Sequence, residues 1–442
     1  FNELINAIKE FEIRDNINPV YLDLYKYFLS DEEYKGKLEK VVSGLSYTNQ
    51  VEKVDKEKIQ QLYENKNLSV SKLEKYAGCP FSYFIQYGLK AQERKEYSFT
   101  APDLGSFVHN ILDIFSKSLN KDKLNWHEIN EDYIRVKVSI IVDEMVSKIP
   151  GFILNSSERY KYLAYRLKKM LISAINIISM QIKQGNFEPV DYEVSFRKNG
   201  KYPPIKLTLN NGEEITLVGQ IDRIDELEKD DSKYIRIVDY KSGDKSINLT
   251  EVYYGLQLQL LVYLDAIIES DKYKKSTLKP AAILYNRIDN PIVKSNEDQK
   301  DSIINEEILK KLRMNGLVLK DKDIIGEMDL SLKEGDRKTS LVIPANFDKN
   351  GNIGRYTKGV TDEEFDILRE YVKYEVKELC ERMVGGDISI IPCKNKNGTS
   401  CDFCSYTSIC QFDVSIKGNT YTVLNDKSDE EVIKLMEKEV KK

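Results

Sequence analysis

The chain has 442 residues, of which 41% are hydrophobic and 31% charged; this composition excludes wholesale disorder and suits two or three globular domains. Its 67 lysines and arginines against 72 aspartates and glutamates give a formal net charge of −5, so a nucleic acid would need a local basic surface. Only two histidines occur, His109 and His127, which largely excludes chemistry that needs several imidazoles.

No apolar run reaches the length of about 18 residues that a membrane-spanning helix needs, so we expect none. We expect a cytoplasmic protein, in which cysteines serve more often as metal ligands or redox groups than as disulfides. The first residue is Phe1 rather than methionine, and we expect a piece of a longer protein or a processed chain.

The first part of the chain has a helical pattern. Residues 1–60 form charged segments, which we expect to be the tail of a preceding domain and a linker. Ser71 and Glu74 have the spacing of a capping box at the start of a short helix that stops at Gly78. Three longer helices are predicted, at 105–118, 128–148 and 156–185.

The pattern then changes to short β-rich segments separated by turn residues. The predicted strands are 191–197, 203–209, 214–224 and 234–241, with a hairpin turn at 210–212. Further elements are predicted as a helix at 252–270, a strand at 281–285, a helix at 361–384 and a short helix in a tail at 416–442. Residues 290–340 are polar and cannot be assigned.

Acidic and basic residues gather at the predicted ends of two strands. Asp222 and Asp239 are 17 residues apart, which suits adjacent strands joined by a turn. Two carboxylates side by side repel unless a cation lies between them, and Mg²⁺ prefers oxygen ligands. Lys241 projects from the same strand face as Asp239, where an ammonium can orient water or stabilise phosphoryl charge. These parts suit metal-assisted phosphodiester hydrolysis, although solvated strand-end charges give the same short pattern.

The late cysteines contain a C-x2-C-x5-C group, formed by Cys401, Cys404 and Cys410. Three thiolates need a fourth ligand to complete a zinc or an iron–sulfur site, and no histidine lies nearby. Cys79 lies at a predicted helix end, Cys380 on an apolar helix face that packing explains, and Cys393 in a polar loop. All three stay open as the fourth ligand.

The sequence Asp222…Asp239-Tyr240-Lys241 resembles the PD-(D/E)XK nuclease motif in its RecB-type form. That form also has a histidine on an early helix and a Gln-x-x-x-Tyr helix after the lysine strand. Here these are His109, and Gln259 with Tyr263. The resemblance implies an α/β fold of restriction-endonuclease type, with a mixed sheet flanked by helices.

The resemblance also implies roles for these residues. It implies Mg²⁺ ligands at His109, Asp222, Asp239 and the main-chain carbonyl of Tyr240. It implies that Lys241 is catalytic, and that Gln259 and Tyr263 line the site and help to position DNA. Glu193 is a looser match to an acidic residue on the first strand.

Iron–sulfur nucleases of RecB type place one cysteine before the nuclease core and a C-x2-C-x5-C group after it. This resemblance implies a [4Fe–4S] cluster on Cys79, Cys401, Cys404 and Cys410. Such a cluster would close a very long loop and clamp 61–415 into one nuclease domain. A zinc ion in the same four thiolates is the alternative.

Several local strings resemble the AddB family of helicase–nuclease subunits, at 71–84, 253–259 and 401–406. The resemblance implies cleavage of single-stranded DNA, on the 5′-terminated strand, during double-strand-break processing and recombinational repair. It also implies a heterodimer with a motor subunit of AddA type. The chain has no G-x-x-x-x-G-K-[ST] motif, so we expect no ATP hydrolysis by this part.

A group of basic residues on one predicted helix is a candidate for DNA backbone contacts: Arg159, Lys161, Arg166, Lys168 and Lys169. The rival interpretation of the whole chain is a non-catalytic DNA-binding or scaffold module with a structural zinc or iron–sulfur site.

Overall fold

The computed structural model describes most of the chain, namely residues 1–14, 16–45, 48–51, 53–63, 67–92, 101–148, 158–270, 277–291, 293 and 301–441. Within these ranges, no helix combines the length and apolar character that crossing a membrane requires.

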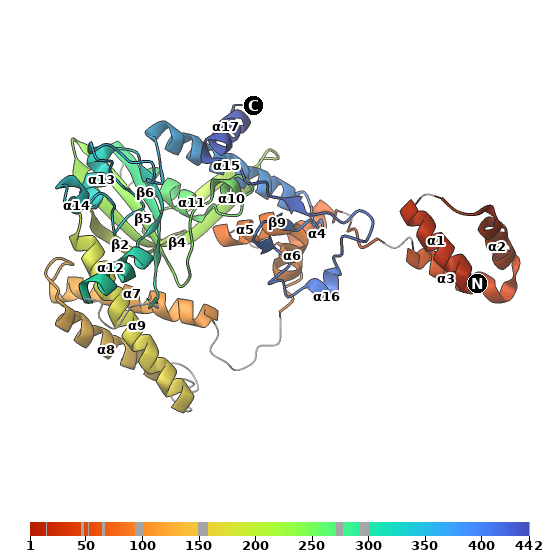
Figure 1. The fold of residues 1–442 in the computed structure, drawn as a ribbon, viewed down its shortest axis with the longest axis horizontal. Helices are drawn as coiled ribbons and strands as arrows, with labels where there is room; N and C mark the ends of the chain where they lie inside the picture. Colours follow the sequence, from red (N-terminus) through yellow and green to blue (C-terminus); the bar gives the residue numbers. More distant parts are fainter. Residues whose placement is uncertain are drawn as a thin grey trace.

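Three helices at the start of the chain pack on one another and lie apart from the rest of the molecule (Figure 1). They are α1 (Asn2–Arg14), α2 (Pro19–Ser30) and α3 (Glu32–Leu45). The rings of Phe1 and Tyr34 each lie 5.2 Å from the ring of Phe28, between centroids. The helical pattern expected for this part of the chain is confirmed.

The next segment connects a strand directly to a helix. Its elements are α4 (Lys56–Leu62), β1 (Asn67–Ser69), α5 (Val70–Gly78), α6 (Pro80–Tyr83) and the π-helix η1 (Phe84–Gly88). The capping box predicted for Ser71 and Glu74 is wrong. The N-cap of α5 is Ser69, whose side chain makes no capping hydrogen bond, because the chain enters the helix straight from β1. Glu74 instead accepts hydrogen bonds from the backbone N–H groups of Leu258 and Gln259.

The main sheet has eight strands in the order β1-β4-β5-β6-β7-β8, and β2 and β3 also pair with β4. The pairs β1–β4, β5–β6 and β7–β8 are parallel, and the others are antiparallel. The mixed sheet expected from the sequence is confirmed. The strands are β2 (Glu188–Phe196), β3 (Ile205–Thr208), β4 (Glu214–Lys229), β5 (Ser232–Lys241), β6 (Thr277–Arg287), β7 (Asn315–Leu319) and β8 (Gly359–Val360).

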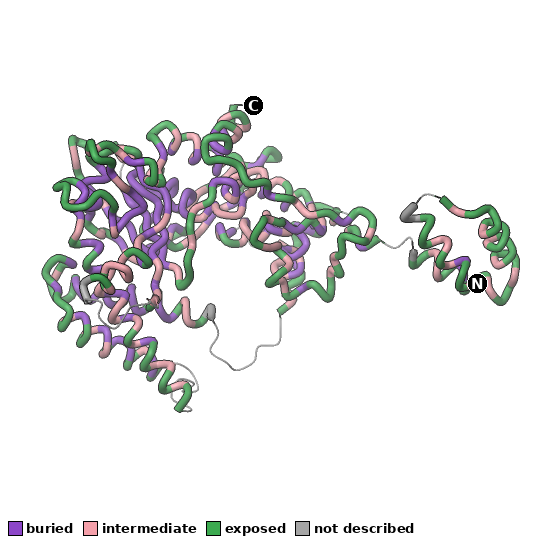
Figure 2. The backbone as a smooth tube through the Cα atoms, viewed as in Figure 1, coloured by how far each residue is buried: buried purple, intermediate pink, exposed green. Residues whose placement is uncertain are grey.

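Helices flank this sheet, whose strands form the most buried part of the molecule (Figures 1 and 2). Helix α7 contacts β2 and α8, which packs on α9; α11 contacts β5, β6 and α15. The bounds are α7 (Ala101–Asp122), α8 (Glu131–Lys148), α9 (Glu158–Lys183), α11 (Gln259–Ile268) and α15 (Asp362–Val384). These helices match the predicted ones, except at 252–270.

The single helix predicted at 252–270 is wrong, because the chain forms two helices there. Helix α10 (Leu249–Tyr253) ends before Gly255, whose φ of 75° lies in the left-handed region that a glycine adopts easily. Helix α11 then starts afresh at Gln259. This break fixes Gln259 in the first turn of a helix.

The segment at 290–340, which could not be assigned from its sequence, contains α12 (Asp301–Leu312), β7, α13 (Lys322–Met328) and α14 (Leu330–Lys333). After α15 the chain forms a small sheet of β9 (Cys393–Asn395), β10 (Gly398–Thr399) and β11 (Thr422–Val423), with the short helix α16 (Thr407–Cys410). Helix α17 (Asp429–Val440) packs on α15 and α10.

A charged network lies buried within the sheet. The carboxylate of Asp225 on β4 lies 2.9 Å from Nε of Arg223 and 2.7 Å from Nε of Arg236. All three residues are at most 1% exposed. Two buried guanidinium groups share one carboxylate, so they depend on it for charge compensation.

Replacing Asp225 should therefore destabilise the fold strongly. We expect Asp225→Asn to lower the free energy of unfolding by about 3–5 kcal/mol, because it leaves two buried cations without an anion. The control is Glu228→Gln on the same strand, whose exposed pair with Lys233 contributes less than about 1 kcal/mol. Urea denaturation measures both; equal effects of the two substitutions would contradict the argument.

Candidate active site

The two aspartates predicted to meet lie on antiparallel neighbours, β4 and β5. In their register Arg223 pairs with Val238, and Asp222 and Asp239 are the next residues along. The turn between the strands contains Asp230 and Asp231, both with positive φ, as tight hairpins require. The predicted pairing of these two strands through a turn is confirmed. Asp222, however, lies inside a strand rather than at its end, because β4 continues to Lys229.

A histidine and two carboxylates converge at this point of the sheet. His109 on α7 has its Nδ1 3.0 Å from Oε1 of Glu193 and 3.3 Å from Oδ1 of Asp222. One ligand atom from each of the three lies within 4.8 Å of the others. On β2, Tyr192 pairs with Arg223 of β4 and Val194 pairs with Ile221. Glu193, between them, therefore lies opposite Asp222.

Glu193 has a backbone φ of 45°, which is unusual for a residue with a side chain. Such local strain persists only where the surrounding structure maintains it, and it gathers at functional sites. Gln220 donates a hydrogen bond of 2.5 Å to the second carboxylate oxygen of Glu193. Only a loose role could be assigned to Glu193 from its sequence context, and the structure brings it into direct contact with His109.

The electrostatics of this group favour a cation. Burial and the nearby charge of Asp222 raise the pKa of Glu193, although His109 opposes the shift. Burial lowers the pKa of His109, but its hydrogen bonds with Asp222 and Glu193 outweigh this and raise it to about 10. The two carboxylates thus stabilise positive charge at the position of the imidazole.

A second group lies on β5 and α11. Nζ of Lys241 is 2.5 Å from Oδ2 of Asp239, and Nε2 of Gln259 donates to Oδ1 of Asp239 at 3.1 Å. The same amide nitrogen lies 2.9 Å from the hydroxyl of Tyr263. Burial and the neighbouring Asp222 raise the pKa of Asp239 to about 6, against the effect of Lys241.

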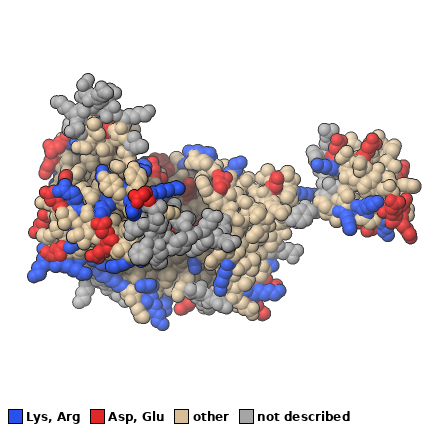
Figure 3. Space-filling view, turned by 90° about the horizontal axis from the view of Figure 1, so that it is seen from below, with Lys and Arg blue, Asp and Glu red and all other residues tan. Residues whose placement is uncertain are grey.

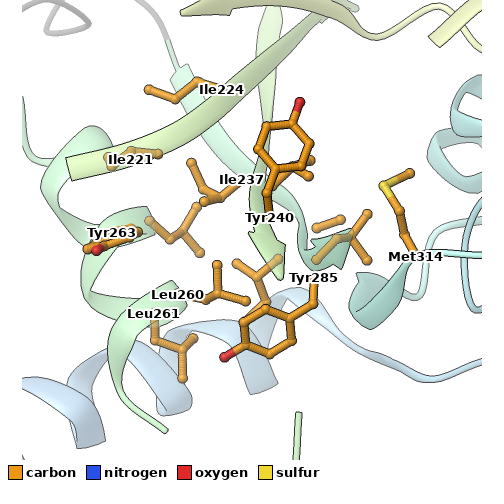
Figure 4. Close-up of a cluster of buried hydrophobic side chains, with 14 of the residues drawn as sticks. Ile221, Ile224, Ile237, Tyr240, Leu260, Leu261, Tyr263, Tyr285 and Met314 are labelled. Carbon is orange, nitrogen blue, oxygen red and sulfur yellow. The ribbon is translucent and has the colours of Figure 1, made fainter. Parts of the chain in front are cut away.

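The backbone of Tyr240 links the two groups, because its N–H donates to Oδ2 of Asp222 at 2.6 Å. Its ring is buried, and its hydroxyl accepts a hydrogen bond from Arg223. Figure 4 shows the rings of Tyr240, Tyr263 and Tyr285 among apolar side chains of the sheet and of α11. The core thus holds fixed the backbone on which Asp239 and Lys241 stand.

The donor set suits a divalent cation. Carboxylate oxygens are the ligands that Mg²⁺ and Mn²⁺ prefer, and the histidine adds one nitrogen. Among the described residues, the set with mutually close ligand atoms contains Glu193 but not Asp239. A role of Asp239 and of the Tyr240 carbonyl as ligands therefore stays a prediction.

Sequence reasoning missed two residues near this site. The carboxylate of Glu74 on α5 accepts the N–H groups of Leu258 and Gln259 at 2.8 and 3.0 Å, and so caps the start of α11. Lys245 lies over the ring of Tyr285 at 4.9 Å and lowers the pKa of Asp239. The contact of Glu74 spans 184 residues of sequence, so no local pattern announces it.

Three of the cysteines lie at a second, smaller apolar cluster apart from the main core. Cys79 separates α5 from α6, and Cys404 and Cys410 pack with it against one apolar cluster that includes Phe81 and Tyr406. Burial raises the pKa of the Cys401 thiol to about 11, and Cys79, Cys410 and Cys404 add to this shift. Cys79, Cys404 and Cys410 are thus close enough to Cys401 to influence its pKa, but among the described residues no three of these sulfur atoms lie all within 4.8 Å of one another.

The two other cysteines differ in their surroundings. Cys380 is fully buried in the main core, as the packing interpretation expected. Cys393 donates a hydrogen bond from its Sγ to the carbonyl of Ala77 at 3.4 Å. Burial raises the pKa of Cys393 to about 11, and the neighbouring Cys79 adds to this shift. The choice of Cys79 as the fourth ligand therefore stays a prediction.

The basic residues of α9 are partly neutralised. Lys161 pairs with Glu158 at 2.8 Å, and Lys168 pairs with Asp143 at 2.6 Å. Lys169 lies over the ring of Tyr165 at 4.8 Å. These contacts weaken the case for α9 as a DNA-contacting surface.

Residues 67–411 match the family model of the PD-(D/E)XK nuclease superfamily. The chain is 62% identical over its full length to a protein of Clostridioides difficile (strain 630), the B component of its ATP-dependent helicase/deoxyribonuclease. It is 52% identical to the component of the same name from Caldanaerobacter subterraneus subsp. tengcongensis, and 48% to that from Thermoanaerobacter sp. (strain X514). The chain spans 38% of the length of each of these relatives.

Removing the cap that Glu74 places on α11 should weaken the fold. We expect Glu74→Ala to lower the free energy of unfolding by about 1–2 kcal/mol, because two backbone N–H groups at the helix start lose their acceptor. The control is Glu144→Ala on the exposed side of α8, where we expect a change within about 0.5 kcal/mol. A Glu74→Ala protein as stable as the control would show that the cap is dispensable.

Proposed function

Because the chain belongs to the PD-(D/E)XK nuclease superfamily, we propose that it is the DNA-cutting part of an AddB-type subunit. It hydrolyses phosphodiester bonds of single-stranded DNA with the help of Mg²⁺. The observation that carries the proposal is the convergence of His109, Glu193 and Asp222 beside the ion pair of Asp239 with Lys241.

Each residue has a role in this proposal. His109, Glu193 and Asp222 hold the metal, joined by Asp239 and the main-chain carbonyl of Tyr240. Bound Mg²⁺ would supply a Lewis acid that activates water and offsets the charge of the phosphate. Lys241 is the catalytic cation, and the positioning residues are Gln259 and Tyr263.

The reaction itself is a displacement at phosphorus. A water oxygen forms a bond to phosphorus while the bond to the leaving sugar oxygen breaks. The attacking water releases one proton to solvent, and the leaving oxygen takes up one proton, so the step balances. The ammonium of Lys241, held by Asp239, can orient this water and stabilise the negative charge that develops on the phosphoryl oxygens. Gln259 fixes the other oxygen of Asp239, which keeps the ammonium in place.

The wider assignment follows the relatives, whose printed name joins a helicase to a deoxyribonuclease. We propose a heterodimer with a motor subunit of AddA type, in the cytoplasm, which processes DNA double-strand breaks for recombinational repair. In that setting this chain cuts the 5′-terminated single strand as the motor delivers it. Residues 61–415 act as one nuclease domain, with 1–60 before it and 416–442 as a C-terminal tail.

A [4Fe–4S] cluster on Cys79, Cys401, Cys404 and Cys410 completes the proposal. What supports it is that Cys79, Cys404 and Cys410 each act on the pKa of Cys401, that they come from both ends of the nuclease domain, and that thiolates are the ligands that such clusters use. The cluster would close the loop between residues 79 and 401 and so stabilise the domain. It needs no redox role there.

Substitutions at the site should separate metal binding from catalysis. In the complex with the motor subunit, we expect Lys241→Ala to reduce the cleavage of single-stranded DNA at least about 100-fold while Mn²⁺ binding is kept. Asp222→Asn should weaken Mn²⁺ binding about 10- to 100-fold and also abolish cleavage. The control is Lys233→Ala, at the other end of β5, which should cut at the parental rate.

The outcomes are measured by gel assays of DNA cleavage and by Mn²⁺ titration followed by electron paramagnetic resonance. Cleavage at the parental rate by Lys241→Ala would refute the nuclease assignment of this site. DNA binding by the parental complex without cleavage in any divalent ion would favour a non-catalytic binding module instead.

The cluster proposal predicts a specific pattern among the cysteines. We expect the protein purified without air to absorb near ~400 nm and to contain iron, as thiolate-bound iron–sulfur centres do. Cys79→Ser should remove this absorbance, whereas Cys393→Ser, the matched control beside it, should keep it. A colourless protein that contains zinc, or loss of iron only in Cys393→Ser, would overturn the assignment.

A further inference from the structure

A large cavity lies between the helices on either side of Cys79 and the late cysteine loop. Its volume is about 750 Å³, and it is lined by β1, α5 and η1 on one wall and by residues 403–406 on the other. The hydroxyl of Tyr406 donates to the carbonyl of Ala91 at 3.1 Å, so the two walls are joined directly. The cavity shares no lining residue with the His109–Glu193–Asp222 group.

The charge of this cavity is of one sign. Its described lining contains three lysines, Lys72, Lys75 and Lys90, and no aspartate or glutamate. None of the three ammonium groups makes an ion pair with a carboxylate in the part of the chain that the structure describes. In a chain with a net charge of −5, this is a local concentration of positive charge. In the view from below, Lys and Arg side chains are interspersed with Asp and Glu side chains at both ends of the molecule (Figure 3).

Aromatic rings and amides accompany the lysines. Nζ of Lys72 lies 4.9 Å over the ring of Tyr87, and Tyr63, Tyr83 and Tyr406 add further rings to the lining. Phe403, between Cys401 and Cys404, is 99% exposed, so its ring is accessible to a ligand. Gln86 and Gln92 supply amide groups.

We propose that this cavity binds a segment of single-stranded DNA, with phosphates on Lys72 and Lys75 and a base stacked on Phe403. Cations that follow a backbone, together with exposed aromatic faces, are what sequence-independent single-strand binding requires. An acidic peptide would match the lysines but would leave the rings unexplained. The proposal rests on the proposed function, because it supplies that site with its substrate strand.

The cavity is connected to the catalytic residues through α5. Lys72 and Lys75 are three residues apart and share one face of this helix. Glu74 points from the same helix to the start of α11, where Gln259 contacts Asp239. A strand held by α5 is therefore held by the element that also fixes the position of the catalytic helix.

The test measures binding of a fluorescent oligothymidylate to the 442-residue protein in EDTA, where no cleavage takes place, over a range of salt concentrations. We expect Lys72→Gln/Lys75→Gln to reduce the slope of log Kd against log salt by about 1.4, since each lost phosphate contact on a single strand removes about 0.7. Phe403→Ala should weaken binding about 5- to 150-fold with the slope unchanged, because a stacked base contributes about 1–3 kcal/mol. Lys434→Gln/Lys438→Gln on α17 is the control with the same loss of charge.

A parental slope in Lys72→Gln/Lys75→Gln, or an equal reduction in the control, would overturn the proposal. The proposal would also be overturned if polyglutamate competed as effectively as unlabelled oligothymidylate while Phe403→Ala bound DNA like the parental protein. That result would assign the cavity to an acidic peptide. An unchanged urea midpoint shows that each variant is folded. If the parental protein never cuts DNA but the lysine and phenylalanine substitutions weaken binding as expected, the proposed nuclease function is refuted and the binding cavity is supported. If the protein cuts DNA normally but these substitutions have no effect on binding, the cavity proposal is refuted and the nuclease function is untouched.

Discussion

The structure depends most on holding three negatively charged carboxylates side by side at the candidate site. Glu193, Asp222 and Asp239 lie on three neighbouring strands, and each is largely withdrawn from water, which disfavours its charged form. Each carboxylate is compensated by donors from another part of the chain: His109 from α7, the N–H of Tyr240 from β5 and the amide of Gln259 from α11. Because no single element supplies these donors, the charges can be held only when the sheet and both helices are in place.

The alternation of side chains along β4 separates two kinds of charge. Asp222 points toward His109, whereas its neighbours Arg223 and Asp225 belong to the buried network with Arg236. Successive residues of a strand face opposite sides of the sheet, so Asp222 lies on the face of the candidate site and Arg223 on the face of the buried network. A slip of the β4 register by one residue would move these side chains to the opposite faces of the sheet, and it would destroy both the candidate site and the buried network. The buried network therefore helps to fix the position of Asp222.

Features encoded by local sequence were predictable, and those that depend on distant contacts were not. The spacing of Asp222, Asp239 and Lys241 could be predicted because one tight hairpin joins their strands. Glu193 could be given only a loose role, since its position follows from the register of β2 on β4 and from an unusual backbone angle. The helix at 252–270 was predicted as continuous because its apolar pattern runs across Gly255, and only the left-handed conformation of that glycine divides it. Glu74 was assigned to a local cap because its partners lie 184 residues away.

One short segment joins the cysteine region to the candidate active site. Residues 67–69 form β1, which pairs in parallel with β4 at residues 216–218, a few residues before Asp222. The chain then enters α5 without a break, caps α11 through Glu74 and ends the helix at Cys79. The sheet, α11 and Cys79 are thus attached to one rigid unit. A clamp at Cys79 would restrain α5 at its far end, and through Glu74 it would restrain Gln259, which contacts Asp239. The proposed cluster would therefore act on the candidate site by limiting where α5 can move, without any redox function.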